Sequence, residues 1–188
     1  MTNQEPSIQI AAAVLMGGSS TRMGSPKQHV DLGGTAMGQR VIELARDCCD
    51  CVVVSGPSDA MPDVEHIPDL AHHTGLGPLA GIEAILTSGR AARWLVLPCD
   101  MPSLKTATAK QLAGSAATIA ALADPANPST PLQLPLALDV SMLQSISDFL
   151  DSGRRSVGGW LSTVNVESLP SPPMREIRNV NSPEDLVS

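Results

Sequence analysis

Apolar runs and segments of helical spacing alternate along the first half of this chain, and this alternation restricts the fold more than any other feature. Three runs are apolar almost throughout: "IQIAAAVL" (residues 8–15), "CVVVSG" (residues 51–56) and "RWLVLPCD" (residues 93–100). Strands that are buried on both faces, as in a parallel sheet, have this character. The shorter run of residues 63–67 predicts a further strand.

The segments between these runs have the features of helices. Residues 35–49 carry apolar side chains at helical spacing. Residues 77–89 begin with Pro78 just inside the expected helix and end with a glycine. Residues 103–114 begin with Ser103 as a candidate N-cap. The alternation of strand and helix predicts the α/β class, with a doubly wound, mostly parallel, twisted sheet and helices on both faces.

The second half of the chain is more ambiguous. Residues 116–124 and 132–138 have the composition of strands, although Pro135 weakens the second. A clear amphipathic helix is expected at residues 141–153, a shorter helix at residues 156–164 and a strand at residues 165–169. Residues 171–174 are expected to form a turn or a linker. The chain of 188 residues is long enough for one sizeable core, so we expect a single domain over residues 1–188.

The charge balance and the hydrophobic runs argue against several classes of protein. The formal net charge is -7, which argues against a nucleic-acid partner. The start, "MTNQEPS", lacks the basic residues of a signal peptide, and no apolar run reaches the roughly 18 residues of a membrane helix. We therefore expect a cytoplasmic protein without a membrane partner. Three of the four cysteines lie in "CCDC" (residues 48–51), without the two-residue spacer of a zinc site, and we interpret them as small buried residues.

The first expected strand leads into a glycine-rich segment, "MGGSSTRMGSPKQ", residues 16–28. Ligands of open parallel sheets bind at the carboxyl ends of the strands. The backbone amides of such a loop can form a nest for phosphates, and Arg22 and Lys27 can neutralise phosphate charge. The segment matches neither the Walker loop nor the dinucleotide fingerprint. A solvent-exposed loop with a few cations is the alternative interpretation.

A carboxylate follows the strand expected at residues 93–100, in the segment "LPCDMP". Asp100 is a candidate ligand for Mg²⁺, which prefers one or two carboxylates together with phosphate oxygens. The alternative is that Asp100 only caps the next helix, although Ser103 already suits that position.

Two further segments carry polar side chains that suit the recognition of a heterocycle. In "IPDLAHHTGLGPLAG", Asp69 can accept two hydrogen bonds from a base edge, and we interpret His72 and His73 as solvated loop residues rather than catalytic ones. In "RNVNSPEDL", Asn179 and Asn181 share one face if the segment is extended. Asparagines are also common in turns, which is the alternative here.

Taken in this order, the segments resemble the nucleotidyltransferases with a GTA-type fold. "LMGGSSTRMGSPK" is similar to their signature loop, and "GLGPLAGI", "LPCDMP" and "NVNSPEDL" are similar to the matching blocks of the molybdenum cofactor guanylyltransferase family. The resemblance covers about residues 8–187. It implies a Rossmann-like nucleotidyltransferase fold, with a nucleotide-binding half at about residues 8–105 and an acceptor or pterin-binding half at about residues 106–188.

The resemblance also implies an activity: Mg²⁺-dependent transfer of GMP from GTP to the terminal phosphate of molybdopterin, with release of pyrophosphate. GTP and molybdopterin would be the substrates, and molybdoenzymes or other cofactor-biosynthesis proteins would be transient partners. By resemblance, Arg22, Lys27 and Asp100 would act in catalysis, with Asp100 holding the metal. The nucleotide would contact Leu15, Met16, Gly17, Gly18, Lys27, Ser55, Asp69, Gly77 and Asp100, and the pterin would contact Asn179 and Asn181.

Two other functions are compatible with the sequence. One is an enzyme that uses CTP, either a molybdopterin cytidylyltransferase or another sugar or alcohol-phosphate nucleotidyltransferase, since Pro26 precedes Lys27 as in those relatives. The other is a carrier that holds the pterin cofactor without catalysis. Arg22, Lys27 and Asp100 argue against a carrier, because it needs no site for a metal and a triphosphate. Met16 stands where the family usually has alanine, and would narrow the base pocket.

Overall fold

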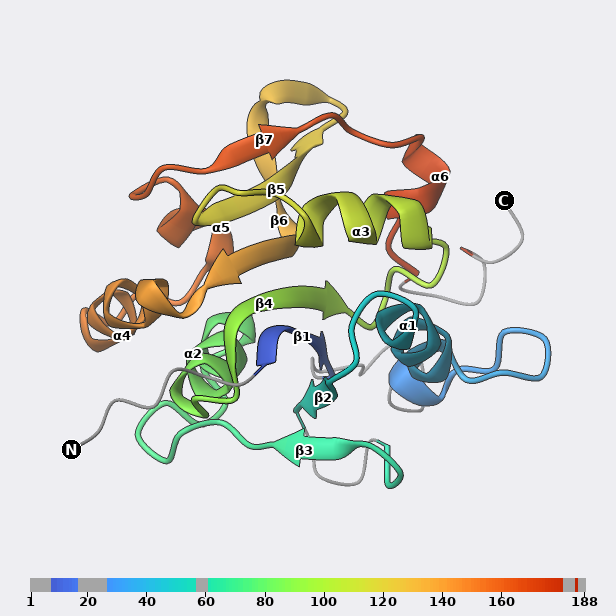
Figure 1. The fold of residues 1–188 in the computed structure, drawn as a ribbon, viewed down its shortest axis with the longest axis horizontal. Coiled ribbons are helices and arrows are strands. Elements are labelled where there is room, and N and C mark those ends of the chain that lie inside the picture. Colours follow the sequence, from blue (N-terminus) through green and yellow to red (C-terminus); the bar gives the residue numbers. More distant parts are fainter. Residues whose placement is uncertain (1–7, 17–26, 57–60, 181–184, 186–188) are drawn as a thin grey trace.

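A seven-stranded sheet runs through the chain in the computed structural model, which describes residues 8–16, 27–56, 61–180 and 185. The strands are β1 (Ile8–Leu15), β2 (Val52–Ser55), β3 (Glu65–Ile67), β4 (Ala91–Pro98), β5 (Ile119–Asp124), β6 (Asn127–Asp139) and β7 (Glu167–Leu169). Their order across the sheet is β3-β2-β1-β4-β6-β5-β7 (Figure 1). β3, β2, β1 and β4 pair in parallel, β6 runs antiparallel to β4 and β5, and β7 runs parallel to β5. The mostly parallel sheet predicted from the sequence is therefore confirmed.

Helices cover both faces of this sheet (Figure 1). On one face lie α1 (Met37–Arg46) and α3 (Thr106–Ala113), and on the other lie α2 (Pro78–Thr87), α4 (Leu143–Asp151) and α5 (Val157–Leu161). Three short helices are η1 (Lys27–His29), η2 (Val140–Met142) and α6 (Met174–Ile177). The sheet is doubly wound because α1 and α3 connect strands across one face, whereas α2, α4 and α5 connect strands across the other.

The core consists of two apolar layers that the central strands separate. In β1, Ala11 and Ala13 face the layer of α2, α4 and α5. Ala12, Val14 and Met16, which directly follows the strand, face the layer of α1 and α3. This alternation of side chains is the period of two that any strand imposes. It explains why the run "IQIAAAVL" is apolar at almost every position: both of its faces are buried.

Several local predictions differ from the structure. The N-cap of α3 is Lys105 and makes no side-chain cap hydrogen bond, so the prediction that Ser103 caps this helix is wrong. The turn or linker expected at residues 171–174 is one residue shorter, because α6 begins at Met174. Pro135 lies within β6, just beyond the residues that pair with β4, where a missing backbone N–H breaks no bond of that ladder.

Of the three cysteines predicted to be small buried residues, Cys49 is buried, whereas Cys48 and Cys51 pack against the apolar layers only partly buried. Cys99 is also buried. Burial raises the pKa of the Cys49 thiol to about 12, so this group stays protonated and unreactive at neutral pH. Among the helices of the described residues, none has the length and apolar character needed to cross a membrane.

Candidate active site

A cavity of about 390 Å³ opens at the carboxyl ends of β1 and β4, and we call it the strand-end pocket. It is lined by Leu15, Lys27, Pro78, Pro98, Cys99, Asp100, Met101, Leu132, Gln133, Leu134 and Asn179. Neighbouring parallel strands end at the same edge of a sheet, so side chains that follow β1 and β4 meet there although they are far apart in the sequence. This is the place where an α/β sheet binds its ligands.

A lysine and a carboxylate form an ion pair within this pocket. The Nζ atom of Lys27, at the start of η1, lies 3.3 Å from Oδ2 of Asp100, which follows β4. Their side chains are 22% and 20% exposed, so each is largely shielded but open to the cavity. The pair places one positive and one negative group beside the same space. A phosphate there would face the ammonium group, and a divalent cation would face the carboxylate.

Three backbone hydrogen bonds fix the chain around the pocket. The N–H of Met16 donates to the carbonyl of Ser55 at 2.6 Å, and the N–H of Cys99 donates to the carbonyl of Leu15 at 3.2 Å. The N–H of Val180 donates to the carbonyl of Asp100 at 2.8 Å. The last bond ties the segment after α6 to the residue that carries the site's carboxylate. Asn179 reaches the strand-end pocket for this reason.

A glycine lets β2 and β1 approach each other at this edge. Gly56 has a φ of +141°, and a Cβ atom there would lie 1.4 Å from the carbonyl oxygen of Met16. A side chain at this position would displace the end of β1, where the glycine-rich segment begins. From the sequence, Gly56 was expected only to end a strand, and this contact was not predicted.

The amino end of α2 points its first turn at the pocket. Gly77 is the N-cap, with a φ of +88° that favours glycine, and Pro78 occupies the first turn and lines the cavity. The unpaired N–H groups of a helix start carry partial positive charge and attract phosphates. The helix therefore adds positive potential on the side where Pro78 lies.

The donor groups of the pocket fit a magnesium ion that arrives together with phosphates. Asp100 is the one carboxylate among the described residues that line the cavity. A single carboxylate cannot enclose Mg²⁺, but Mg²⁺ in nucleotide sites takes one or two carboxylates and completes its shell with phosphate oxygens and water. The site thus suits a metal–nucleotide complex better than a metal alone.

The structure brings four of the predicted site residues together and places others elsewhere. Leu15, Lys27, Asp100 and Asn179 all line the strand-end pocket. Four predicted residues fall outside the described part of the chain: Gly17, Gly18, Arg22 and Asn181. Asp69 is not among the lining residues, and its Oδ2 accepts a hydrogen bond from the N–H of Gly75 at 2.9 Å.

Two side chains that were predicted to contact a nucleotide are buried in the structure. The side chain of Met16 is fully buried in the layer of α1 and α3, so the prediction that it narrows a base pocket is wrong. The hydroxyl of Ser55 is buried beneath α2, where a Cβ on Gly81 would lie 2.6 Å from it. Ser55 therefore serves the close packing of α2 on β2, and its contact with a nucleotide stays a prediction.

Sequence reasoning missed the contribution of β6. Leu132, Gln133 and Leu134 form one wall of the strand-end pocket, because this antiparallel strand returns past the end of β4. The rule that ligands lie at the carboxyl ends of parallel strands does not identify residues in the middle of an antiparallel one.

The prediction that both histidines are solvated is wrong for His73, which is 5% exposed.

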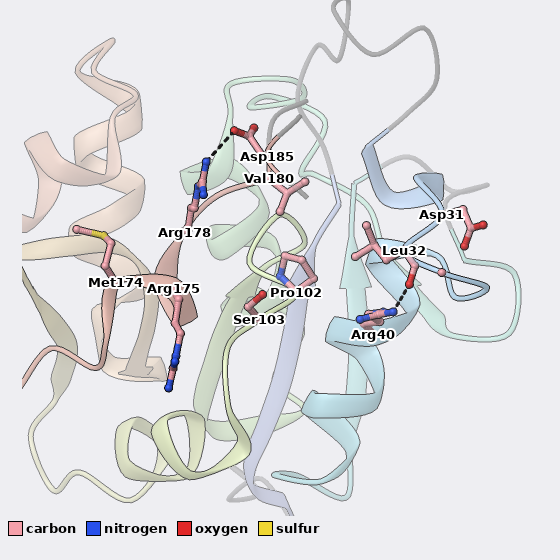
Figure 2. Close-up of a pocket in the computed structure, with 11 residues that line it drawn as sticks. Asp31, Leu32, Arg40, Pro102, Ser103, Met174, Arg175, Arg178, Val180 and Asp185 are labelled. Carbon is pink, nitrogen blue, oxygen red and sulfur yellow. Dashed lines mark hydrogen bonds and ion pairs between the residues drawn. The ribbon is translucent and has the colours of Figure 1, made fainter. Parts of the chain in front are cut away.

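A second cavity, of about 590 Å³, lies on the other side of the segment that carries Asn179, and we call it the arginine pocket. Arg178 and Val180 line it, whereas Asn179 between them lines the strand-end pocket. Its other lining residues are Asp31, Leu32, Gly33, Arg40, Pro102, Ser103, Met174, Arg175 and Asp185. Figure 2 shows Arg178 pointing at Asp185, 3.5 Å away, and Arg40 pointing at the carbonyl of Leu32. Three arginines and two aspartates give this cavity an excess of positive charge.

Known proteins resemble this chain in both sequence and fold. A family model described as "MobA-like NTP transferase domain" matches residues 12–164. A molybdenum cofactor guanylyltransferase from Shewanella baltica is 34% identical over 95% of this chain and 94% of its own length. The crystal structure of a molybdopterin-guanine dinucleotide biosynthesis protein A from Archaeoglobus fulgidus superposes with a TM-score of 0.75 over 94% of this chain and 95% of its own, at 24% identity. A nucleotidyl transferase from Methanothermobacter superposes with a TM-score of 0.74 at 18% identity, over 95% of this chain and 94% of its own.

Proposed function

Because this chain belongs to the MobA-like NTP transferase family, and is therefore a nucleotidyltransferase, we propose that it joins GMP from GTP to molybdopterin. The name of the Shewanella relative supports the guanylyl group and the cofactor. The single observation that carries the proposal is the ion pair of Lys27 and Asp100 in the strand-end pocket. It puts a phosphate-binding cation and a candidate metal ligand beside one cavity, as nucleotidyl transfer requires.

The chemistry of this transfer needs no covalent intermediate with the protein. An oxygen of the terminal phosphate of molybdopterin attacks the α-phosphorus of GTP and forms a new P–O bond. The bond between the α-phosphorus and the oxygen bridging to the β-phosphorus breaks, and its electron pair leaves with pyrophosphate. Both reactants are anions, so the protein contributes mainly by holding them together and by neutralising charge.

Each group of the pocket has a distinct role in this scheme. Lys27 binds the triphosphate and stabilises the charge that develops during transfer, with Arg22 in support and the amides of Gly17 and Gly18 on the phosphates. The start of α2 at Gly77 adds positive potential. Asp100 would hold Mg²⁺, which when bound polarises the phosphates and assists the departure of pyrophosphate.

The base and the acceptor occupy opposite parts of the site in this proposal. Leu15 and the main chain of Met16 contact the nucleoside, and Asp69 reads the edge of guanine, all from the half of the chain at about residues 8–105. Asn179 and Asn181 bind the pterin from the half at about residues 106–188. The arginine pocket directly behind Asn179 supports this assignment, since its positive charge suits an anionic acceptor.

We place this reaction in the cytoplasm, with molybdoenzymes and other cofactor-biosynthesis proteins as transient partners that receive or deliver the pterin. The test is formation of the dinucleotide product from GTP, molybdopterin and Mg²⁺, followed by mass spectrometry. Wild-type protein should form it, Asp100→Asn should lose it, and Asp63→Asn, at an exposed carboxylate outside both cavities, should retain it. Absence of product with wild-type protein, or full activity of Asp100→Asn, would contradict the proposal.

A further inference from the structure

A buried histidine anchors the loop that connects β3 to α2, residues 68–77. His73 is 5% exposed, although the loop on which it lies is largely at the surface. Its Nδ1 lies 2.6 Å from Oε2 of Glu83 in α2, and its Nε2 lies 3.2 Å from Oδ1 of Asp151 at the end of α4. Both ring nitrogens therefore face a carboxylate, and the imidazole joins the loop to two helices.

Glu83 completes this network from within α2. Its side chain is 1% exposed, and its second oxygen, Oε1, accepts a hydrogen bond from the hydroxyl of Ser147 in α4 at 2.6 Å. A carboxylate buried between two helices is costly unless both of its oxygens have partners. Here His73 and Ser147 supply them, so the loop provides one of the two groups that make this burial tolerable.

The same cluster has the donor atoms of a metal site, but its atoms are already engaged. His72, His73 and Glu83 present ligand atoms within 4.8 Å of one another. A metal ion would have to displace the short contact between His73 and Glu83 and would compete with Ser147 for the carboxylate. The network is closed as it stands, which favours a role in holding protein segments together.

Both ends of this loop lie at the edge of the sheet that carries the strand-end pocket. Ile67, just before the loop, pairs with Ser55 of β2, which in turn pairs with Leu15 of β1. At the other end, Gly77 leads into Pro78, which lines the pocket. A shift of the loop would therefore move the start of α2 relative to the ends of β1 and β2.

The loop also fixes its own shape through Asp69. The carboxylate of Asp69 accepts the N–H of Gly75, and the N–H of His73 donates to the carbonyl of Leu70 at 2.9 Å. These local bonds define the form of the loop, but they do not attach it to the rest of the molecule. Leu70 and Leu76 pack the loop against the apolar core, and the side chain of His73 adds polar contacts that reach both α2 and α4.

We propose that His73 is a positioning residue for the nucleotide site: by its contacts with Glu83 and Asp151 it sets where Asp69 and the first turn of α2 lie. This inference rests on the proposed function, since Asp69 and α2 matter to catalysis only if the strand-end pocket binds a nucleotide. His73 is not among the residues that line the pocket, so its effect is on nucleotide affinity and not on the chemical step.

The charges around His73 make this anchor sensitive to pH. Glu83 faces it from α2, Asp151 faces it from α4, and the ring of His72 lies 4.3 Å from its own, centroid to centroid. The hydrogen bond to Glu83 is the main cause that raises the pKa of His73, with Asp151 adding to it and burial opposing it. As the pH rises through that raised value the ring loses its charge, and the attachment to the two carboxylates weakens.

The test compares the Michaelis constants for GTP of wild-type protein and two variants of adjacent histidines. His73→Asn keeps a neutral donor near Glu83 but removes the charge, and should raise KM for GTP by about tenfold with little change in kcat, because a smaller fraction of molecules holds the binding-competent loop. His72→Asn, at the exposed neighbour, should leave KM unchanged. In wild-type protein KM should rise with pH, and this rise should disappear in His73→Asn.

A second variant and a second readout keep the test decisive. Glu83→Gln should lower the pKa of His73, measured from the ring signals in NMR, and shift the rise in KM to lower pH. Amide hydrogen exchange across residues 69–77 should be faster in His73→Asn, whether or not GTP proves to be the substrate. If exchange is faster in His73→Asn but wild-type protein does not turn over GTP, the proposed function is contradicted and the anchoring role of His73 is not. Unchanged exchange, or faster exchange with an unchanged KM for GTP, would overturn the role of His73.

Discussion

The ammonium group of Lys27 lies 3.3 Å from a carboxylate oxygen of Asp100, although 73 positions separate the two residues in the chain. The sheet creates this contact, because β1 and β4 are parallel neighbours and both residues follow their carboxyl ends. With Mg²⁺ and nucleotide bound, Asp100 would turn to the metal and Lys27 to the phosphates. In the proposed reaction the contact between Lys27 and Asp100 would then be replaced by a contact of Lys27 with phosphate and of Asp100 with Mg²⁺.

Replacing Lys27 by methionine should reduce kcat by roughly 100-fold or more, because a preorganised charge on the transferring phosphate is lost. The free energy of unfolding should change by less than about 1 kcal/mol, since partly exposed ion pairs stabilise proteins only weakly. Pyrophosphate release and urea unfolding measure the two effects. Lys110→Met, at an exposed lysine of α3, is the matched control and should keep full activity. A similar loss of kcat in both variants would contradict a specific role for Lys27, because it would show that the net charge of the protein determines the rate.

Gly56→Ala should destabilise the protein by at least about 3 kcal/mol, through backbone strain and steric overlap together. The physical reason is the carbonyl of Met16, which a Cβ at this position would approach to 1.4 Å. Gly89→Ala is the matched control, since Gly89 also has a positive φ, +66°, but an added methyl group there would meet no atom within 4 Å. It should cost only about 1–2 kcal/mol, the strain of the left-handed backbone. Equal losses in urea unfolding would contradict the role given to the Met16 contact.

How much of this site follows from the sequence depends on the kind of element that carries each residue. Lys27 and Asp100 could be predicted, because apolar runs mark the parallel strands and functional side chains follow their ends. Met16 could not be placed correctly from the sequence. The alternation of side-chain directions in β1 continues one residue beyond the strand, so the side chain of Met16 points into the core. The residues of β6 could not be predicted, because their place beside β4 depends on a long-range antiparallel pairing.

The histidine of the buried network illustrates the same limit. "AHHTG" is typical of a polar loop, and nothing local separates His72 from His73. The two histidines differ because His73 contacts Glu83, which in turn bonds Ser147, and these residues lie on two helices that come together only in the folded chain. A glutamate within an otherwise apolar helix, "PLAGIEAILT", was the one available signal, because a buried carboxylate requires a partner.

The stability of the protein should depend on pH through His73. Folding raises the pKa of this group above 6.5, so the folded chain binds the proton more tightly than the unfolded chain does. The stabilisation is fully present below pH 6.5 and is lost as the pH rises through the raised value. At low pH the free energy of unfolding in urea should be about 1–2 kcal/mol higher for wild-type protein than for His73→Asn, and this difference should shrink as the pH rises. A difference that grows with pH would contradict this sign.

Arg175→Ala should raise the Michaelis constant for the acceptor several-fold and leave that for GTP unchanged, because Arg175 lines the arginine pocket and not the strand-end pocket. Arg155→Ala, at an exposed arginine outside both cavities, serves as the control. Steady-state kinetics with each substrate varied in turn measures the two constants. An increase confined to GTP would place the nucleotide, and not the acceptor, at the arginine pocket.

Calorimetric titration of the protein with GTP and with CTP, each with and without Mg²⁺, tests the central claim most directly. We predict that GTP binds in the presence of Mg²⁺, that it binds more tightly than CTP, and that Asp100→Asn abolishes the effect of the metal. Tighter binding of CTP would contradict the guanylyl assignment and place the protein among the cytidylyl enzymes. Binding of neither nucleotide, with or without Mg²⁺, would contradict the account of the strand-end pocket as a nucleotide site.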